Sequence, residues 1–161
     1  MNKTEKLVLT SDKLYINKVE QFIEQICDEY NIYNNYYANI LLSVIEAYTN
    51  AVEHGNKYDE NKSVKIEFSS ESNGLAFTIE DQGDGFDINN IPDPTNIENE
   101  GAEGRGLFMI NSLADQVEIE NNGSKIKLAF LISSINREMA NKRNELFHKY
   151  VNQNVKKEQM H

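Results

Sequence analysis

The sequence predicts a two-layer α/β (α+β) sandwich in which helices pack on one face of a mainly antiparallel sheet. Two observations lead to this fold class: helical patterns occupy the first third of the chain, and alternating patterns of period two then form two β-hairpins. Strands joined by a hairpin are antiparallel, and their apolar face must be covered. With 161 residues, 39% of them hydrophobic, the chain suits a single domain with its own core.

The first predicted elements are a short alternating run and a helix. Residues 6–10 alternate, and residues 10–12 (Thr-Ser-Asp) supply helix-capping oxygens. Apolar residues then recur with helical spacing over residues 19–30. The only cysteine, Cys27, lies on this apolar face, so we expect a buried thiol without a redox role, which suits a reducing compartment.

A second helix and a first hairpin follow. The helical period continues over residues 37–52, and Gly55 followed by Asn56 predicts the end of this helix. Residues 64–68 and 75–79 alternate, and the Asn73-Gly74 pair between them predicts a type I′ turn.

The rest of the chain contains a long loop, a short helix and a second hairpin. Residues 83–104 have no apolar period and hold both prolines, which is typical of a loop that is either disordered or functional. A short helix is expected at 107–114, then a hairpin over 117–130 around Asn122-Gly123. We therefore assign residues 1–133 to the domain and 134–161 to a charged helical extension with a frayed end.

Charge and hydropathy exclude several classes of function. The net charge of −10 disfavours nucleic acid as the main ligand, because duplex binding needs a basic face. The N-terminus lacks the apolar core of a signal peptide, and no window is apolar enough to cross a membrane. We expect a cytoplasmic protein whose partners are small molecules or proteins, with no nucleic acid and no membrane.

The second helix carries the first candidate site. Glu46, Asn50 and Glu53 stand at i, i+4 and i+7 and form one polar row about opposite the apolar stripe. A solvated helix face explains such a row equally well. An asparagine inside a helix is a poor helix former, however, and a carboxylate one turn earlier could serve as a general base beside an oxygen-coordinated Mg²⁺.

Two glycine-containing stretches are the other candidates. In residues 81–86, Gly83 and Gly85 would let the backbone approach a ligand while Asp81 offers an acceptor, although a simple glycine-rich turn remains an alternative. The two glycines exclude an EF-hand, which needs acids at those offsets. Residues 101–110 end the loop and open a helix, so their free N–H groups could hold phosphate oxygens; they match neither a Walker loop nor a Rossmann turn.

Taken in order, the stretches at 45–56, 80–86 and 104–110 resemble the N box and the two glycine boxes of the GHKL ATP-binding family. This family includes gyrase, heat-shock chaperones and histidine kinases. The resemblance runs from about residue 41 to residue 130, and it is closest to bacterial anti-sigma-factor serine/threonine-protein kinases of the RsbW type. It implies the Bergerat fold, in which the nucleotide lies between helices and sheet under a mobile lid.

The resemblance also implies roles for individual residues. By position, Asn50 corresponds to the Mg²⁺ ligand, Glu46 to the base that activates the attacking hydroxyl, and Asp81 to the acceptor for the adenine amine. Arg105 could reach a phosphate or be a solvated lid residue, and His54 could be structural or catalytic. The implied ATP-binding residues are Asn50, Asp81, Gly83, Gly85, Gly104, Arg105 and Gly106.

The function implied is that of a Mg-ATP-dependent serine/threonine kinase and anti-sigma factor. Such a protein sequesters a sigma factor until it is released to a STAS-domain antagonist, and commonly forms a homodimer. A histidine kinase fragment is less expected because residues 1–53 contain no histidine, and a topoisomerase or chaperone because no transducer domain follows. A nucleotide-gated binding module without phosphotransfer stays open as the alternative.

Overall fold

The computed structural model describes residues 3–32, 35–85, 102–132 and 145–153, and within them five strands form one sheet. All four strand pairs are antiparallel, and the order across the sheet is β1-β2-β3-β5-β4. The strands are β1 (Thr4–Thr10), β2 (Ser63–Glu71), β3 (Gly74–Glu80), β4 (Gln116–Glu120) and β5 (Lys125–Leu131).

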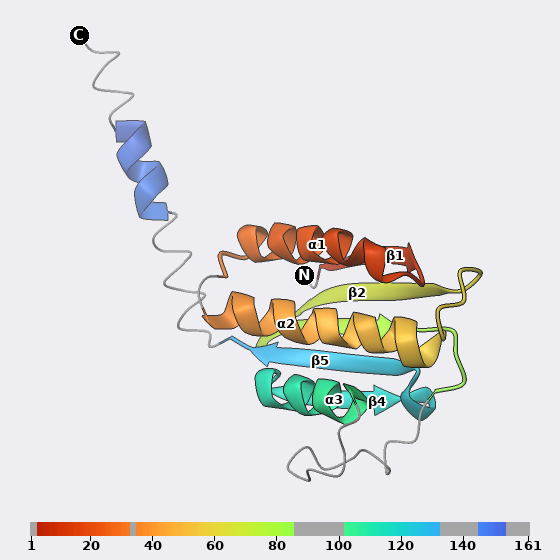
Figure 1. Cartoon of the computed structure of the whole chain (residues 1–161). Coiled ribbons are helices and arrows are strands. Elements are labelled where there is room, and N and C mark those ends of the chain that lie inside the picture. The colour runs from red at the N-terminus through yellow and green to blue at the C-terminus, as the bar shows by residue number, and fades with distance from the viewer. Residues whose placement is uncertain (1–2, 33–34, 86–101, 133–144, 154–161) are drawn as a thin grey trace. The chain divides into compact units, whose positions relative to one another are not determined.

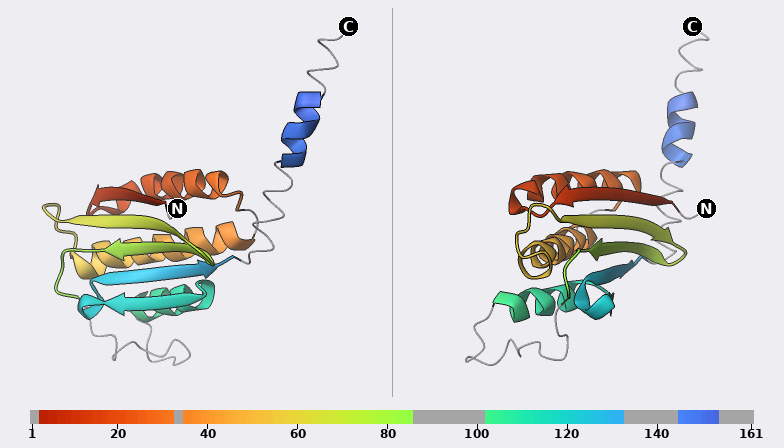
Figure 2. Two further views of the ribbon diagram at one scale, coloured as in Figure 1. Left: turned by 180° about the vertical axis from the view of Figure 1, so that it is seen from behind. Right: turned by 90° about the vertical axis from the view of Figure 1, so that its right-hand side faces the viewer.

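The helices lie on one face of this sheet, and the other face is open (Figures 1 and 2). The second helix continues from α2 without a break into a π-helical turn, η2, and two short 3-10 turns flank the strands. The helical elements are η1 (Lys13–Tyr15), α1 (Ile16–Glu29), α2 (Asn35–Asn50), η2 (Ala51–Gly55), α3 (Ala102–Leu113) and η4 (Asn121–Gly123). The predicted two-layer sandwich is confirmed.

Alternation along the strands builds the core between the two layers. In β2, every second residue from Val64 is buried, and those after Val64 pair in register with buried residues of β3. Phe68 and Phe77 face each other across β2 and β3 with ring centroids 5.4 Å apart, and Phe130 of β5 extends the row at 6.4 Å from Phe77. Tyr30, at the end of α1, packs on Phe68 at 5.3 Å. Aromatic pairs of this kind add to the stabilisation that burial provides.

The open face of the sheet is polar. Residues that point away from the helices are mostly Lys, Glu, Thr and Ser, and the lysines pair with glutamates of other strands, in three cases on the neighbouring strand and in one across β3. The pairs are Lys6–Glu67 (3.4 Å), Lys65–Glu80 (3.5 Å), Lys125–Glu120 (3.7 Å) and Lys127–Glu71 (2.9 Å). Exposed pairs contribute only about 0–1 kcal/mol each, so their main effect is to keep this face hydrated.

The first hairpin turn differs from the prediction. The register pairs Glu71 with Gly74, so the turn consists of Ser72 and Asn73, and neither residue has the positive φ of a type I′ turn. Gly74 belongs to β3, where a Cβ would collide with the backbone oxygen of Phe130. The glycine therefore marks a close approach between strands and not the turn itself.

Cys27 is buried, as predicted, and burial raises the pKa of its thiol to about 11. The second hairpin forms around η4, in which Asn121, Asn122 and Gly123 all have positive φ. Most of the long loop at 83–104 lies outside the described residues, and so does the expected lid.

The C-terminal extension is a separate unit. The structure divides the chain at residue 131, with the second unit running from Ile132 to His161. Its described helix covers residues 145–153, which lie inside the predicted extension at 134–161. Among the helices of the described residues, none has the length and apolar character needed to cross a bilayer.

We predict that Gly74→Ala destabilises the protein by about 1–3 kcal/mol, because the new methyl group forces β3 and β5 apart. Urea denaturation monitored by circular dichroism measures this change. Asn73→Ala, at the exposed turn position beside it, is the control and should change stability by less than about 0.5 kcal/mol. Equal stability of the two variants would contradict the close approach.

Candidate functional site

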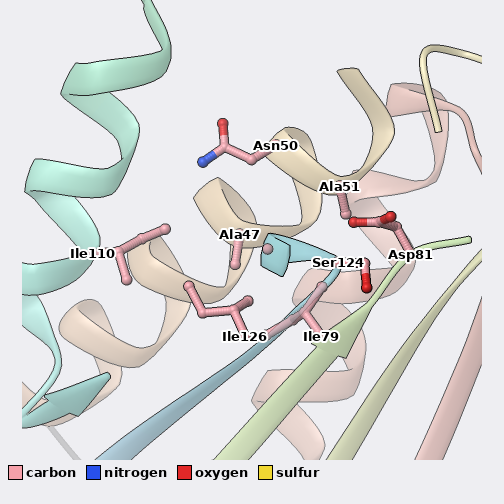
Figure 3. Close-up of a pocket in the computed structure, with 9 residues that line it drawn as sticks. Ala47, Asn50, Ala51, Ile79, Asp81, Ile110, Ser124 and Ile126 are labelled. Carbon is pink, nitrogen blue, oxygen red and sulfur yellow. The ribbon is translucent and has the colours of Figure 1, made fainter. Parts of the chain in front are cut away.

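A pocket opens where the C-terminal end of α2 and α3 meet the ends of β3 and β5 (Figure 3). Its empty volume is about 280 Å³, a figure that includes open space at its mouth. Its walls are mostly aliphatic, with few polar groups. The lining residues are Ala47, Asn50, Ala51, Ile79, Asp81, Ile110, Gly123, Ser124 and Ile126.

Asp81 is the buried charged group of the pocket. It follows β3 directly, its N–H donates to the Ser124 carbonyl (2.9 Å), and only 7% of the residue is exposed. One carboxylate oxygen, Oδ1, accepts the Gly83 N–H at 2.8 Å. Burial raises the pKa of this carboxyl group, while the bond from Gly83 acts in the opposite direction. Within the described part of the chain, no hydrogen bond to the second oxygen, Oδ2, is seen, so this oxygen can accept one from a ligand.

The glycines around Asp81 are required by close contacts within the chain. A Cβ on Gly55 would collide with the Asp81 carboxylate, and a Cβ on Gly83 with the Gly55 carbonyl oxygen. Gly85, with φ of 85°, lies against the carbonyl oxygen of Asn122. Gly83 and Gly85 thus lie against other parts of the same chain, and their contact with a ligand stays a prediction.

The predicted polar row on the second helix is only partly kept. Asn50, the last residue of α2, lines the pocket, and Glu46 lies half-buried one turn earlier, outside the lining. The helix widens at η2, which changes the angle between successive side chains. Glu53 therefore leaves the row, and its carboxylate forms an ion pair with Lys13 of η1.

The cluster around Glu53 also contains His54. The Glu53 carboxylate accepts the Tyr58 hydroxyl at 3.0 Å and lies 3.4 Å from His54 Nε2. His54 is half-buried, and it does not line the pocket. The structure thus places the histidine against its neighbour in sequence, where a structural role suffices.

The second glycine box lies inside a helix. We predicted a short helix at 107–114 from its apolar residues, but α3 begins earlier, at Ala102. Gly104, Arg105 and Gly106 thus belong to the first turns of α3. The side chain of Arg105 is not described. Ile110, one to two turns later, is the α3 residue that reaches the pocket.

Sequence reasoning missed most of the apolar lining. Ala47 of α2 and Ala51, the first residue of η2, stand at i and i+4, and two small residues one turn apart are a signal for close approach on that face. Ile79 and Ile126 were predicted as core strand residues, and they pair directly across β3 and β5. Their position at the end of the sheet, where the core opens, could not be seen from alternation.

The described residues hold no group of three or more His, Cys, Asp or Glu that could bind a metal ion. Asn50 offers one amide oxygen at the pocket. A Mg²⁺ ion commonly takes few protein ligands and completes its shell with water and substrate phosphates. The donor set thus fits a metal that arrives with a phosphorylated ligand.

Comparison with known proteins finds one family model and similar solved structures. A sequence profile described as a histidine kinase-like ATPase domain matches residues 9–130. No curated protein matches the chain at a significant level. Among solved structures, the chain is similar to the histidine kinase domain of the blue-light activated histidine kinase from Erythrobacter litoralis EL346, with 19% identity and a TM-score of 0.46. The match covers 76% of this chain and 61% of the other.

We predict that Asp81→Asn stabilises the ligand-free protein at pH 7 and not at pH 3. Because burial raises the pKa, the folded state holds the proton more tightly than the unfolded state, so Asp81 lowers stability as the pH rises through that range. The neutral amide removes this cost at pH 7. At pH 3 the aspartate is itself mostly neutral. Thermal unfolding at both values measures the difference, with the exposed Asp84→Asn as control; an equal change at both values would contradict the prediction.

Proposed function

The chain belongs to the histidine kinase-like ATPase family, and from this premise we propose that it is a Mg-ATP-dependent serine/threonine kinase that acts as an anti-sigma factor. The observation that carries the ATP assignment is the buried Asp81 carboxylate in a mostly aliphatic pocket, with Asn50 on the wall formed by α2. A buried acceptor with one unused oxygen fits a ligand that brings a hydrogen-bond donor on a flat apolar ring.

Adenine meets these requirements. Its exocyclic amine donates to Asp81, and its ring faces contact Ile79, Ile110 and Ile126, while Ala47 leaves room on the side of α2. Guanine carries a carbonyl oxygen at the corresponding ring position. An ionised carboxylate only accepts hydrogen bonds, so it disfavours that oxygen. The pocket therefore favours ATP over GTP.

The triphosphate lies toward Asn50 and the start of α3. Asn50 contributes an amide oxygen to Mg²⁺, and the free N–H groups at the beginning of a 12-residue helix suit phosphate oxygens, with Gly104, Arg105 and Gly106 in the first turns. Bound Mg²⁺ supplies positive charge that neutralises the phosphates. That charge matters here, because the chain has a net charge of −10.

Glu46 is the proposed general base. It stands one helical turn before Asn50 and is half-buried, beside the metal ligand and outside the adenine pocket. In the transfer, a substrate serine or threonine oxygen bonds to the γ-phosphorus as the bond to the β-γ bridging oxygen breaks. The hydroxyl proton passes to the Glu46 carboxylate.

The partners are proposed from the family resemblance of the three motifs. They are a sigma factor that is sequestered and a STAS-domain anti-anti-sigma protein that is phosphorylated, with a homodimer as the assembly. The alternative is a nucleotide-gated binding module of the same fold without phosphotransfer. A histidine-kinase-like phosphotransfer is the third reading, and the identity of the phosphorylated residue separates it from the first.

We predict that millimolar Mg-ATP raises the thermal midpoint, because a ligand that binds only the folded state stabilises it by about 2.7 kcal/mol at 100 times its dissociation constant.

Asp81→Asn should weaken ATP binding by about 10- to 100-fold relative to the unmutated protein, the effect of a lost charge-assisted hydrogen bond. Calorimetry measures both affinities. Unchanged affinity in the variant would remove Asp81 from the site.

We predict a contrast between Glu46→Gln and Asn50→Ala. Loss of the base should leave ATP affinity intact and slow phosphotransfer by about 10²- to 10⁴-fold. Loss of the metal ligand should weaken both. The assay uses radiolabelled ATP and candidate STAS proteins, with phosphoamino-acid analysis of the product. Full activity of Glu46→Gln would exclude it as the base, and ATP binding without transfer by the unmutated protein would favour the binding module.

A further inference from the structure

Asn56 is a buried polar residue to which neither the sequence motifs nor the pocket assign a role. It follows η2 directly, is 1% exposed, and its N–H donates to the Ala51 carbonyl at 2.8 Å, which closes the π-helical turn. Its side chain contacts the ends of three strands. A buried amide of this kind is stable only when its donors and acceptor all find partners.

Every hydrogen-bonding atom of the Asn56 side chain is engaged. Oδ1 accepts the Gln82 N–H at 2.7 Å, just beyond β3. Nδ2 donates to the Ser63 carbonyl of β2 at 2.9 Å and to Ser11 Oγ, just beyond β1, at 2.5 Å. One side chain therefore joins the end of α2 and η2 to the ends of β1, β2 and β3.

Three of these groups form a closed ring. Gln82 Oε1 accepts the Ser63 N–H at 2.8 Å, so Asn56, Ser63 and Gln82 each donate to one member of the ring and accept from another. A closed ring resists the displacement of any one member, because two hydrogen bonds must lengthen at once. The ring thus fixes the distance between the end of the helix and the end of β3.

Two members of the ring are sequence neighbours of the residues that surround the proposed adenine acceptor, Asp81. Gln82 is the residue after Asp81, and Asn56 is the residue after Gly55, whose Cα lies too close to the Asp81 carboxylate to admit a Cβ. We propose that Asn56 is a positioning residue that sets the depth of the Asp81 carboxylate in the pocket, and so determines the preference for adenine over guanine. This inference rests on the proposed ATP binding.

An asparagine is the residue type that this position requires. The site needs one acceptor for a backbone N–H and two donors for a carbonyl and a hydroxyl oxygen, in one short side chain. Aspartate would keep the acceptor and lose both donors, and alanine would lose all three bonds. Aspartate would thus still hold the end of β3 through the Gln82 N–H, whereas alanine removes every side-chain bond between this position and the strand ends.

The test compares Mg-ATP and Mg-GTP affinities by titration calorimetry. Asn56→Ala should reduce ATP affinity by about 10-fold, the effect of one misplaced hydrogen bond, and leave GTP affinity unchanged. The exposed Asn61→Ala, the same substitution in the neighbouring loop, is the matched control and should keep the preference for ATP. If Asn56→Ala does not fold, Gln82→Ala opens the ring from its exposed side and should shift the preference in the same direction.

A double-mutant cycle with Asp81→Asn tests the route of the effect. If Asn56 acts through Asp81, adding Asn56→Ala to Asp81→Asn causes no further loss of ATP affinity. Additive losses, or a variant that melts earlier but keeps its ATP preference, would overturn the inference and leave Asn56 as a purely structural residue. If the unmutated protein binds neither nucleotide, the proposed function falls together with it; a retained preference in Asn56→Ala overturns only this inference.

Discussion

The pocket depends on a contact between two backbones that come closer than any side chain would permit. The end of η2 lies against the end of β3, with Gly55 facing the Asp81 carboxylate and Gly83 facing the Gly55 carbonyl. Asp81 is buried at this contact, and burial raises the pKa of its carboxyl group. Because of this contact, the mostly aliphatic pocket also contains one buried carboxyl group.

Other features of the fold hold the two backbones in place. The register of β3 with β5 sets Ile79 opposite Ile126 and brings the Ser124 carbonyl to the Asp81 N–H. On the opposite layer, the hydroxyl of the buried Tyr48 donates to the Asp12 carbonyl at 2.7 Å and ties α2 to the segment after β1. The second helix is therefore tied to the rest of the domain at two residues, Tyr48 and Asn56.

The sequence predicted the layers, the strands and the helices, because burial on one face imposes a period that local reading detects. It also located Asn50 and Asp81, which the structure brings to one pocket. It failed where the backbone departs from ideal geometry. The i, i+4, i+7 spacing predicted that Glu53 shares one helix face with Glu46 and Asn50. The π-helical turn changes this geometry, and Glu53 pairs with Lys13 instead. Asn56 was predicted only as a helix stop, since hydrogen bonds between strand ends leave no periodic trace.

The order of strands has a consequence for how the protein is made. In the sheet, β5 lies between β3 and β4, although β4 precedes it in the chain. On the ribosome, β3 emerges early and keeps an unpaired edge until residues 125–131 have followed it. At about 5–20 residues per second, this interval lasts a few seconds. During that time the nascent chain presents a strand edge that can pair with the wrong partner. A chain truncated before β5 lacks Ile126 and therefore cannot form the complete pocket.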